Sequence, residues 1–214
     1  MIFRRLTTNR LFVLAVLLAA LVPGFVSNRL YNETPEEYII AVQSADEEAV
    51  GVDLAIIEFD DFGMLWLPEQ LDRAVELIDR RNAQSQRGII MVTYTHGWQN
   101  NADSSREKND LTRFRAGMQE LARELREEGG RAPDHVVGVY LGWRGATNRV
   151  PGWKNLSFWN RKAAAERIAS YQMRETLFRV TAAAKARPDT KVLLSGHSMG
   201  GMILGKTLAP TLAT

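Results

Sequence analysis

The sequence predicts an α/β fold in three layers around a mostly parallel sheet, and three observations support this. Short apolar runs recur along the chain, and amphipathic segments with helical spacing separate them. The run Ile89-Ile90-Met91-Val92 is apolar on both faces, as in strands that a parallel sheet buries. With 214 residues, 45% of them hydrophobic, the chain can also enclose one sizeable core.

Four strands are expected after residue 50, each ending in a polar or glycine-containing turn. They cover residues 54–59, 88–95, 135–141 and 191–194. Because strands alternate with helices, the sheet should be built from right-handed crossover units.

The helices are expected between and after these strands. The first begins near Pro68, and the second ends at Gly129-Gly130. A single long helix is expected from about residue 160 to residue 187, and a last one follows Ser198 and runs into Pro210. The apolar faces are marked by Leu71, Ala74, Val75 and Ile78 in the first helix, by Leu111, Phe114, Met118, Leu121 and Leu125 in the second, and by Ala164, Ile168, Tyr171, Phe178 and Ala182 in the long one.

The N-terminus predicts export. Arg4, Arg5 and Arg10 precede an apolar run over residues 11–22, which Pro23-Gly24 interrupts. Residues 1–27 therefore form an uncleaved signal-anchor or a cleaved signal peptide, with a buried core helix as the third alternative. In the first two cases the basic flank stays cytoplasmic. The domain should lie in the cell envelope, either held to the membrane by residues 11–26 or released. Residues 28–50 are expected to be a polar, acidic connector, although Tyr38-Ile39-Ile40-Ala41-Val42 can pack against the domain.

Composition excludes several kinds of function. The chain has 27 Lys and Arg against 25 Asp and Glu, so its net charge of +2 indicates no nucleic-acid partner. It has no cysteine, which excludes disulfides, thiolate metal sites and a cysteine nucleophile.

The strongest motif is Gly196-His197-Ser198-Met199-Gly200, which reads G-x-S-x-G between a strand and a helix. In this context the serine sits on a sharp turn that lifts its hydroxyl out of the sheet. The Met199 N–H, at the start of the helix, can stabilise an oxyanion.

A second motif, Thr95-His96-Gly97-Trp98, follows an earlier strand at the same expected edge of the sheet. Acyl transfer needs two N–H donors, and each contributes about 3 kcal/mol to stabilising the transition state. The backbone N–H of Trp98, made accessible by Gly97, is the natural second donor. The alternative interpretation of this motif is purely structural: His96 and Gly97 would form a turn that ends the strand, with the histidine side chain capping it.

Together these motifs resemble the α/β-hydrolase family, which includes serine esterases and lipases. The resemblance covers residues from about 53 to the C-terminus, and Gly142-Trp143-Arg144-Gly145 looks like an uncharacterised bacterial branch. It implies that Ser198 is the nucleophile and that Met199 and Trp98 form the oxyanion hole. It also implies that no metal or organic cofactor is needed and that the substrate is a small-molecule or lipid ester. The supporting motif residues are His96, Gly97, Gly196, His197, Gly200 and Gly201.

The sequence departs from the family after Ser198, where the acid and the general-base histidine are expected. No Asp, Glu or His follows Ser198, and the three histidines, His96, His135 and His197, all precede it. A serine without a base is a weak nucleophile. We therefore expect residues 51–214 to be an incomplete hydrolase-like domain with weak activity or none. It would be a fragment, an inactive relative, or a chain that a partner completes.

Other functions remain open. A non-catalytic envelope or interaction protein could keep the same scaffold. Residues 200–207 also match the phosphate-binding pattern G-x-x-x-x-G-K-T, although their apolar centre favours a buried helix.

Three further candidate sites rest on weaker signals. Trp143 and Arg144 could contact the substrate, or they could serve the turn and the surface. Trp153, Phe158 and Trp159 could line an acyl pocket or touch lipid, or they could pack the loop onto the long helix. Glu58, Asp60 and Asp61 could hold a hard metal ion, but a strand-end turn is enough to explain them. The oligomeric state is not indicated.

Overall fold

A computed structural model describes residues 30–42, 50–105, 108–127, 133–146 and 158–212. The elements, in chain order, are α2 (Pro35–Tyr38), β1 (Ile39–Val42), β2 (Gly51–Phe59), α3 (Pro68–Gln84), β3 (Ile89–Thr95), α4 (Asp110–Glu127), β4 (His135–Trp143), α5 (Phe158–Ile168), α6 (Tyr171–Lys185), β5 (Lys191–Gly196) and α7 (Met199–Leu212). The predicted apolar segment at residues 1–27 lies outside the described residues. Within them, no helix has the length and hydropathy needed to cross a bilayer.

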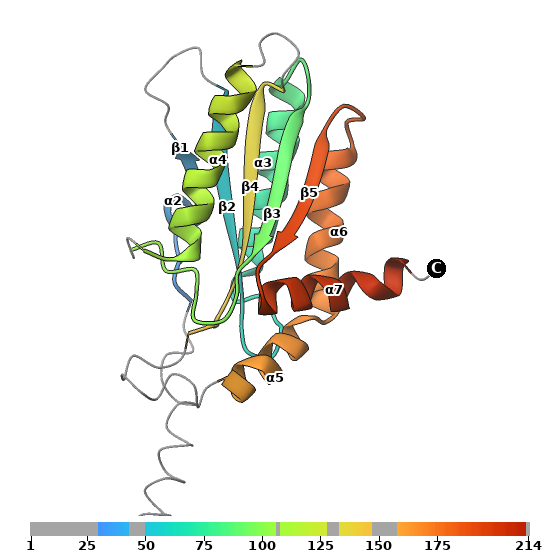
Figure 1. Cartoon of the computed structure of the whole chain (residues 1–214). Helices are drawn as coiled ribbons and strands as arrows, with labels where there is room; N and C mark the ends of the chain where they lie inside the picture. Colours follow the sequence, from blue (N-terminus) through green and yellow to red (C-terminus); the bar gives the residue numbers. More distant parts are fainter. Residues whose placement is uncertain (1–29, 43–49, 106–107, 128–132, 147–157, 213–214) are drawn as a thin grey trace, which may run out of the picture.

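The predicted α/β fold with a mostly parallel sheet is confirmed. Five strands pair in the order β1-β2-β4-β3-β5, and only β1 runs antiparallel to its neighbour. The carboxyl ends of β2 to β5 therefore meet at one end of the sheet, which lies at the bottom of Figure 1. We call this the C-terminal end of the sheet and the opposite one the N-terminal end.

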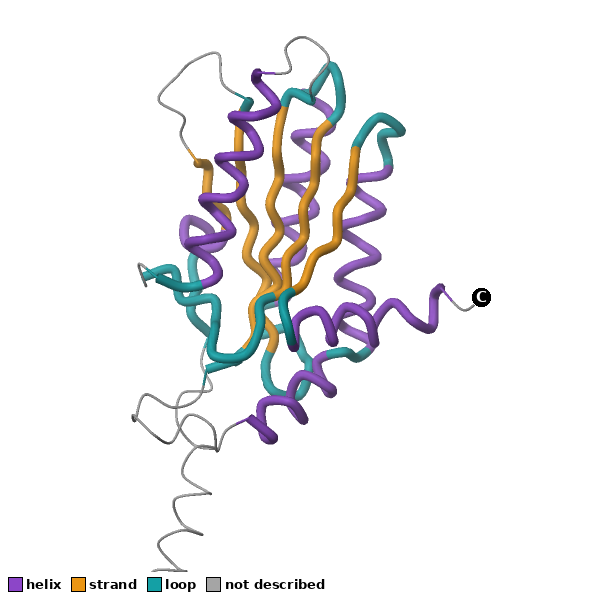
Figure 2. The backbone as a smooth tube through the Cα atoms, in the orientation of Figure 1, coloured by secondary structure: helices purple, strands orange, loops and turns teal. Residues whose placement is uncertain are grey.

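Helices cover both faces of the sheet (Figures 1 and 2). One core cluster joins α3, α6 and α7 to one face, and a second joins α4 to the other. Strands β2 and β4 are buried along almost their whole length, as their continuous apolar sequences predict. At Gly138 in β4, an added Cβ would lie 2.5 Å from Leu54 Cδ2 and 3.0 Å from Phe114 Cε1. Glycine there allows α4 to approach the sheet closely.

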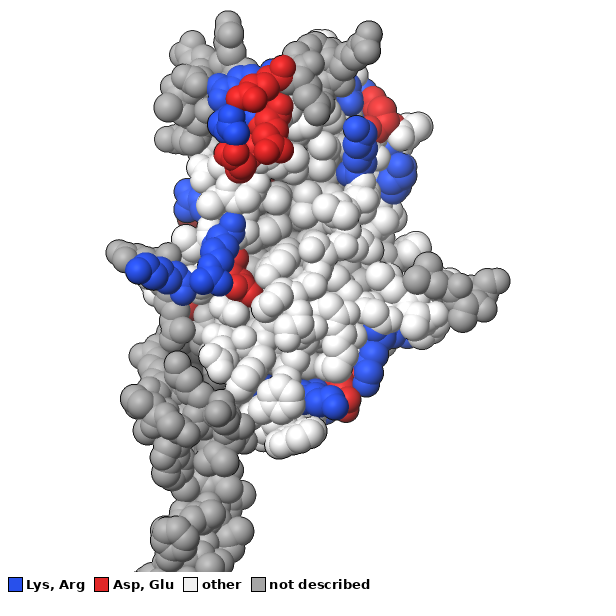
Figure 3. Space-filling view, viewed as in Figure 1, with Lys and Arg blue, Asp and Glu red and all other residues white. Residues whose placement is uncertain are grey.

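The face of the sheet at β5 is less covered than the rest. Leu193 in this strand is 57% exposed, whereas Val192 and Leu194 pack on the core from the other face. Figure 3 shows few charged side chains over β5 and α7, in contrast to the ends of α4.

The prediction of one long helix over residues 160–187 is wrong. The chain breaks at Ala169 and Ser170, and Ser170 is the N-cap of α6. The two halves have different partners, since α5 packs on α7 while α6 packs on α3 and β5. Tyr171 and Phe178, expected on the buried face, are 72% and 69% exposed, because Met173, Leu177 and Val180 fill the core instead.

The connector predicted at residues 28–50 also contributes to the domain where it is described. Tyr38 is fully buried, and β1 adds an antiparallel edge strand to β2. The run from Tyr38 to Val42 therefore packs against the domain, one of the two possibilities that the sequence left open.

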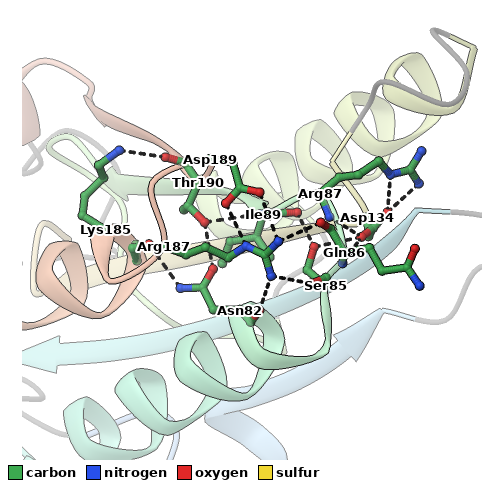
Figure 4. A network of polar contacts seen from close by, with 12 residues as sticks. Asn82, Ser85, Gln86, Arg87, Ile89, Asp134, Lys185, Arg187, Asp189 and Thr190 are labelled. Atoms are coloured by element: carbon green, nitrogen blue, oxygen red, sulfur yellow. Dashed lines mark hydrogen bonds and ion pairs between the residues drawn. The ribbon is translucent and has the colours of Figure 1, made fainter.

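Polar side chains connect the loops at the N-terminal end of the sheet (Figure 4). Asp134, just before β4, accepts hydrogen bonds from Ser85 Oγ (2.9 Å) and from the backbone N–H groups of Gln86 and Arg87 (2.6 and 2.9 Å). Arg187 donates to the backbone oxygens of Asn82 and Gln86 and to Asp189. The turns before β3, β4 and β5 are thus joined in one network.

Candidate active site

Ser198 stands at a sharp turn between β5 and α7. Its φ is +52°, in the left-handed region that a residue with a Cβ rarely adopts. The backbone of Met202 donates to Ser198 O (3.1 Å), so the helix begins immediately after the turn. Ser198 is exposed, while Met199 and Gly200 beside it are buried. The chain therefore presents a serine at a strained strand-to-helix corner.

Glycines let this corner lie directly on the end of β3. A Cβ at Gly200 would stand 2.0 Å from Thr95 O, and a Cβ at Gly196 would stand 2.8 Å from the backbone of Gly200. The His197 N–H donates to Thr95 O at 3.1 Å. The first turn of α7 is thereby fixed against the strand that carries the second predicted motif.

The loop after β3 reaches the serine corner. A Cβ at Gly97 would lie 2.7 Å from His197 Nδ1 and 3.3 Å from Ser198 Cβ. Trp98 is the next residue, and Met199 opens α7, where the first N–H groups have no intrahelical acceptor. The structure thus brings together the two loops that carry the predicted donors. Their roles as an oxyanion hole stay predictions.

His96 is buried and neutral. Its Nε2 accepts the backbone N–H of Trp143 at 3.0 Å, so its Nδ1 carries the proton and donates to Gly97 O at 2.9 Å. Burial lowers the pKa of His96 to about 4. Its ring stacks on Trp143 and Tyr140, with centroids 5.4 and 5.5 Å away. His96 therefore holds the loop in place and cannot act as a base.

The loop after β4 supports the loop after β3. The Gln99 N–H donates to Gly145 O at 2.9 Å, and Gln99 itself has a φ of +69°. A Cβ at Gly145 would lie 2.7 Å from the backbone oxygens of Gly97 and Asn100. The Trp143 indole donates to His96 O at 2.9 Å. Residues 96–100 and 143–145 thus form one tightly packed unit beside Ser198.

Trp143 and Arg144, the predicted substrate-side residues, are both buried. Arg144 and Arg161 each form an ion pair with Asp61, at 2.8 Å for Arg161 Nη1, and Arg161 also donates to Arg144 O at 3.0 Å. Burial opposes ionisation of Asp61, but hydrogen bonds and ion pairs with the two arginines outweigh it and lower the pKa of this carboxyl. A substrate role for Trp143 and Arg144 stays a prediction, and their side chains stabilise the loop.

The acidic residues at the end of β2 and just after it bind protein groups. Asp60 accepts the backbone N–H groups of Phe62 and Met64, and Glu58 accepts those of Tyr31 and Asn32. Within the described residues no cluster of three or more acidic or histidine side chains is placed to hold a metal ion. These contacts match the turn interpretation of the acidic residues.

An aromatic contact joins α5 to the serine corner. Trp98 meets Phe158 edge-on at 5.2 Å between ring centroids, and Phe158 meets Trp159 at 5.4 Å. Trp159 is 72% exposed. Trp153, the other aromatic residue of the predicted acyl pocket, lies outside the described residues.

None of the three histidines is placed as a general base for Ser198. His135 starts β4, six residues before the end of the sheet at which Ser198 lies, or about 20 Å along the strand. Its Nε2 lies 2.6 Å from Asp53 Oδ2. His197 precedes the serine and lies against Gly97.

The phosphate-binding match at residues 200–207 lies within α7. Ile203 and Leu204 are buried, and Thr207 Oγ1 donates to Ile203 O at 2.8 Å. Lys206 pairs with Glu166 at 3.2 Å. The segment is helical where an open anion-binding loop would be needed.

Sequence reasoning missed the polar contacts that hold this end of the sheet. Asn32, a partner of Glu58, and Arg161, a partner of Asp61, lie 26 and 100 residues away along the chain, so no local spacing predicts these pairs. The one available signal was the presence of acidic residues where a buried strand ends.

In comparisons with known proteins, no family model, curated protein or solved structure matches this chain.

Proposed function

We propose that this protein is a serine hydrolase of the α/β-hydrolase type, which cleaves an ester bond through Ser198. The observation that supports this most directly is the exposed serine at a left-handed strand-to-helix turn, with the Gly97 loop packed against it. A serine held in a strained conformation marks a functional site more often than a structural one.

In the proposed reaction, Ser198 Oγ attacks the ester carbonyl and its proton passes to the leaving alcohol. The acyl group stays on Ser198 as an ester until water attacks it and releases the acid. The backbone N–H groups of Met199 and Trp98 would stabilise the oxyanion in both steps, each by about 3 kcal/mol. No metal or organic cofactor takes part in this proposal.

The described residues place no general base beside Ser198. Because His96 is neutral, fully buried and bonded through both ring nitrogens, it cannot take the serine proton. We therefore expect the chain by itself to react slowly. This observation also favours the second candidate function, a non-catalytic envelope protein that retains the scaffold.

A fluorophosphonate probe, which phosphonylates activated serines with loss of fluoride, separates the two functions. We expect slow labelling of the full chain that Ser198→Ala abolishes. Ser195→Ala is the matched control, because Ser195 lies three residues upstream in β5 and should leave labelling intact. A folded wild-type chain that takes up no probe even after long incubation favours the scaffold function.

The N-terminal apolar run supports a membrane attachment for this hydrolase. Basic residues precede the run over residues 11–22, as in segments that start translocation. We propose that the domain is exported and stays on the membrane through this segment. Protease protection of the domain in intact cells, lost on opening the envelope, would support this topology.

A further inference from the structure

The described chain begins at the C-terminal end of the sheet, where Ser198 also lies. The backbone N–H groups of Tyr31 and Asn32 donate to the Glu58 carboxylate at 3.1 and 2.9 Å, and Glu58 stands at the end of β2. The Asn32 side chain, fully buried, donates to the same carboxylate at 2.8 Å and to Ala102 O at 2.9 Å. The chain is thus fixed to the edge that presents the serine.

Two more contacts hold this attachment. Gln70 Nε2 donates to Asn32 O at 2.8 Å, and Asn101 Nδ2 donates to the Tyr31 hydroxyl at 3.1 Å. Asn101 and Ala102 belong to the same loop as Trp98. The segment that follows the N-terminal apolar run is therefore bound to the loop that carries a proposed oxyanion donor.

This attachment limits where the apolar run can lie. Val26 is the last residue of the segment 11–26 that is expected to hold the domain to the membrane, and Leu30 is the first described residue. Four residues span at most about 14 Å when fully extended. The short length of chain between Val26 and Leu30 therefore favours a membrane at the C-terminal end of the sheet over one at the N-terminal end.

Exposed apolar side chains gather at this same end. Among the described residues six large hydrophobic side chains are exposed, and four of them lie where strands end or where α5 and α6 begin. These four are Phe62 (69%), Met64 (50%), Trp159 (72%) and Tyr171 (72%). The other two, Phe178 and Leu193, lie further along α6 and β5.

Two of these side chains lie beside cations, and hydrogen bonds fix the turn that carries two of the four. Asp60 Oδ1 accepts the N–H groups of Phe62 and Met64 at 2.8 and 2.9 Å, which fixes their turn. The Arg167 guanidinium lies 5.9 Å from the Phe62 ring centroid, and Lys162 Nζ lies 5.6 Å from that of Trp159. Figure 3 shows basic side chains beside uncharged ones at this lower end, over α5. Aromatic rings with neighbouring Lys or Arg are typical of surfaces that sit at a lipid headgroup layer.

We propose that the C-terminal end of the sheet rests on the bilayer that holds residues 11–26, so that Ser198 faces the membrane. Phe62, Met64, Trp159 and Tyr171 would enter the headgroup layer. The choice of substrate rests on the proposed function: the hydrolase would cleave acyl esters of amphiphiles that reside in that bilayer, in preference to dissolved esters.

The absence of cysteine allows a direct test of this orientation. Single variants Phe62→Cys, Trp159→Cys, Phe178→Cys and Gln86→Cys of the full chain carry an environment-sensitive fluorophore. Each is reconstituted into phosphatidylcholine vesicles that contain a nitroxide-headgroup lipid. Phe178 is a matched control for Phe62, since both are phenylalanines with 69% exposure. Gln86 is exposed at the N-terminal end of the sheet.

We expect strong quenching at positions 62 and 159, weaker quenching at 178, and little at 86. Equal quenching at all four positions, stronger quenching at 86, or a chain that does not float with the vesicles would overturn the orientation. The readout needs no catalysis and should be unchanged in Ser198→Ala. A failure of the proposed hydrolase activity is therefore distinguishable from a failure of the orientation.

A second measurement tests the substrate class. A fluorophosphonate with a long alkyl chain partitions into vesicles, whereas one with a polar linker stays in water. In vesicles we expect the alkyl probe to label Ser198 several-fold faster, and in detergent solution we expect this advantage to shrink. Equal rates for both probes in vesicles would overturn the preference for membrane esters.

Discussion

Both ends of the sheet carry paired polar groups, but among the described residues only the C-terminal end also carries non-glycine residues with positive φ. At the N-terminal end, Asp134, Arg87, Arg187 and Asp189 pair with one another or with backbone groups (Figure 4). At the C-terminal end, both non-glycine residues with positive φ in the described chain, Gln99 and Ser198, lie next to tightly packed glycines.

We propose that this difference separates the structural end of the sheet from the end that carries the function. Polar side chains that are hydrogen-bonded or ion-paired to one another connect the turns, and they have no free group to offer a substrate. Under the proposed function, the strained and exposed Ser198 is the reactive group, and the buried neutral His96 holds the loop beside it. Variants at the C-terminal end should therefore change Ser198 reactivity, and variants at the N-terminal end should change stability alone.

The largest effect is expected for Gly200→Ala. The new Cβ would stand 2.0 Å from Thr95 O, a backbone atom that cannot rotate away. We expect a loss of about 3 kcal/mol or more in the free energy of unfolding, measured by urea denaturation, together with loss of probe labelling.

Gly205→Ala is the matched control in the same helix. A Cβ there meets nothing within 4 Å, so the better helix propensity of alanine should stabilise the chain by up to about 1 kcal/mol. Equal destabilisation by both substitutions would show that the contact of Gly200 with β3 does not determine the loss in the free energy of unfolding.

The next largest effect is expected in the pH dependence of the free energy of unfolding, to which His96 contributes. Burial holds its pKa at about 4, below the ordinary 6.5, so the unfolded chain binds the proton more readily. The stability that His96 contributes is complete above pH 6.5 and is lost as the pH falls toward 4. The difference corresponds to roughly 3 kcal/mol.

His96→Gln should remove this part of the acid sensitivity, since glutamine can still accept the Trp143 N–H but does not titrate. Urea denaturation of both proteins across this pH range gives the difference directly. Parallel stability curves for the two proteins would mean that His96 is not buried in the neutral form.

A smaller loss of stability with a clear effect on labelling is expected for Gly97→Ala. Its Cβ would meet His197 Nδ1 at 2.7 Å, and that side chain can move, so we expect a cost of about 1 to 2 kcal/mol. The displaced loop would move the Trp98 donor, and loss of one donor slows acyl transfer by about 100-fold. Probe labelling at an unchanged rate in the folded variant would count against Trp98.

The smallest effect is expected for Asp134→Asn. Burial opposes ionisation, but hydrogen bonds from Arg87, Ser85 and Gln86 outweigh it and lower the pKa of Asp134 to about 2. The stabilisation is present above the ordinary pKa of 3.8 and is lost as the pH falls toward 2. Because the group is partly exposed, we expect a cost of about 1 kcal/mol at neutral pH.

Wild type and Asp134→Asn should converge in stability near pH 2, and probe labelling should not differ between them at neutral pH. A change in labelling without a change in stability would contradict the expectation that variants at the N-terminal end of the sheet affect stability alone.

The sequence predicted the strands and their alternation with helices well, because buried parallel strands are continuously apolar. It also placed Ser198 and Gly97 at one end of the sheet, since both motifs follow strands. It failed at the break between α5 and α6, because Ser170 and the different partners of the two halves interrupt a pattern that looks periodic.

The polar contacts around the site could not be predicted. Asp61 pairs with Arg161 one hundred residues later, and Glu58 binds Asn32 twenty-six residues earlier. Such pairs form only once the sheet has assembled, so no periodic pattern in the sequence indicates them.

The strand order has a consequence for how this chain is made. β4 lies between β2 and β3 in the sheet. Neither of these two strands can therefore pair with β4 until residues 135–143 have emerged from the ribosome. Until then the nascent chain carries two apolar strands that cannot pair through β4, and such segments are prone to misassociate. We expect this protein to rely on chaperones during synthesis more than a meander of adjacent hairpins would.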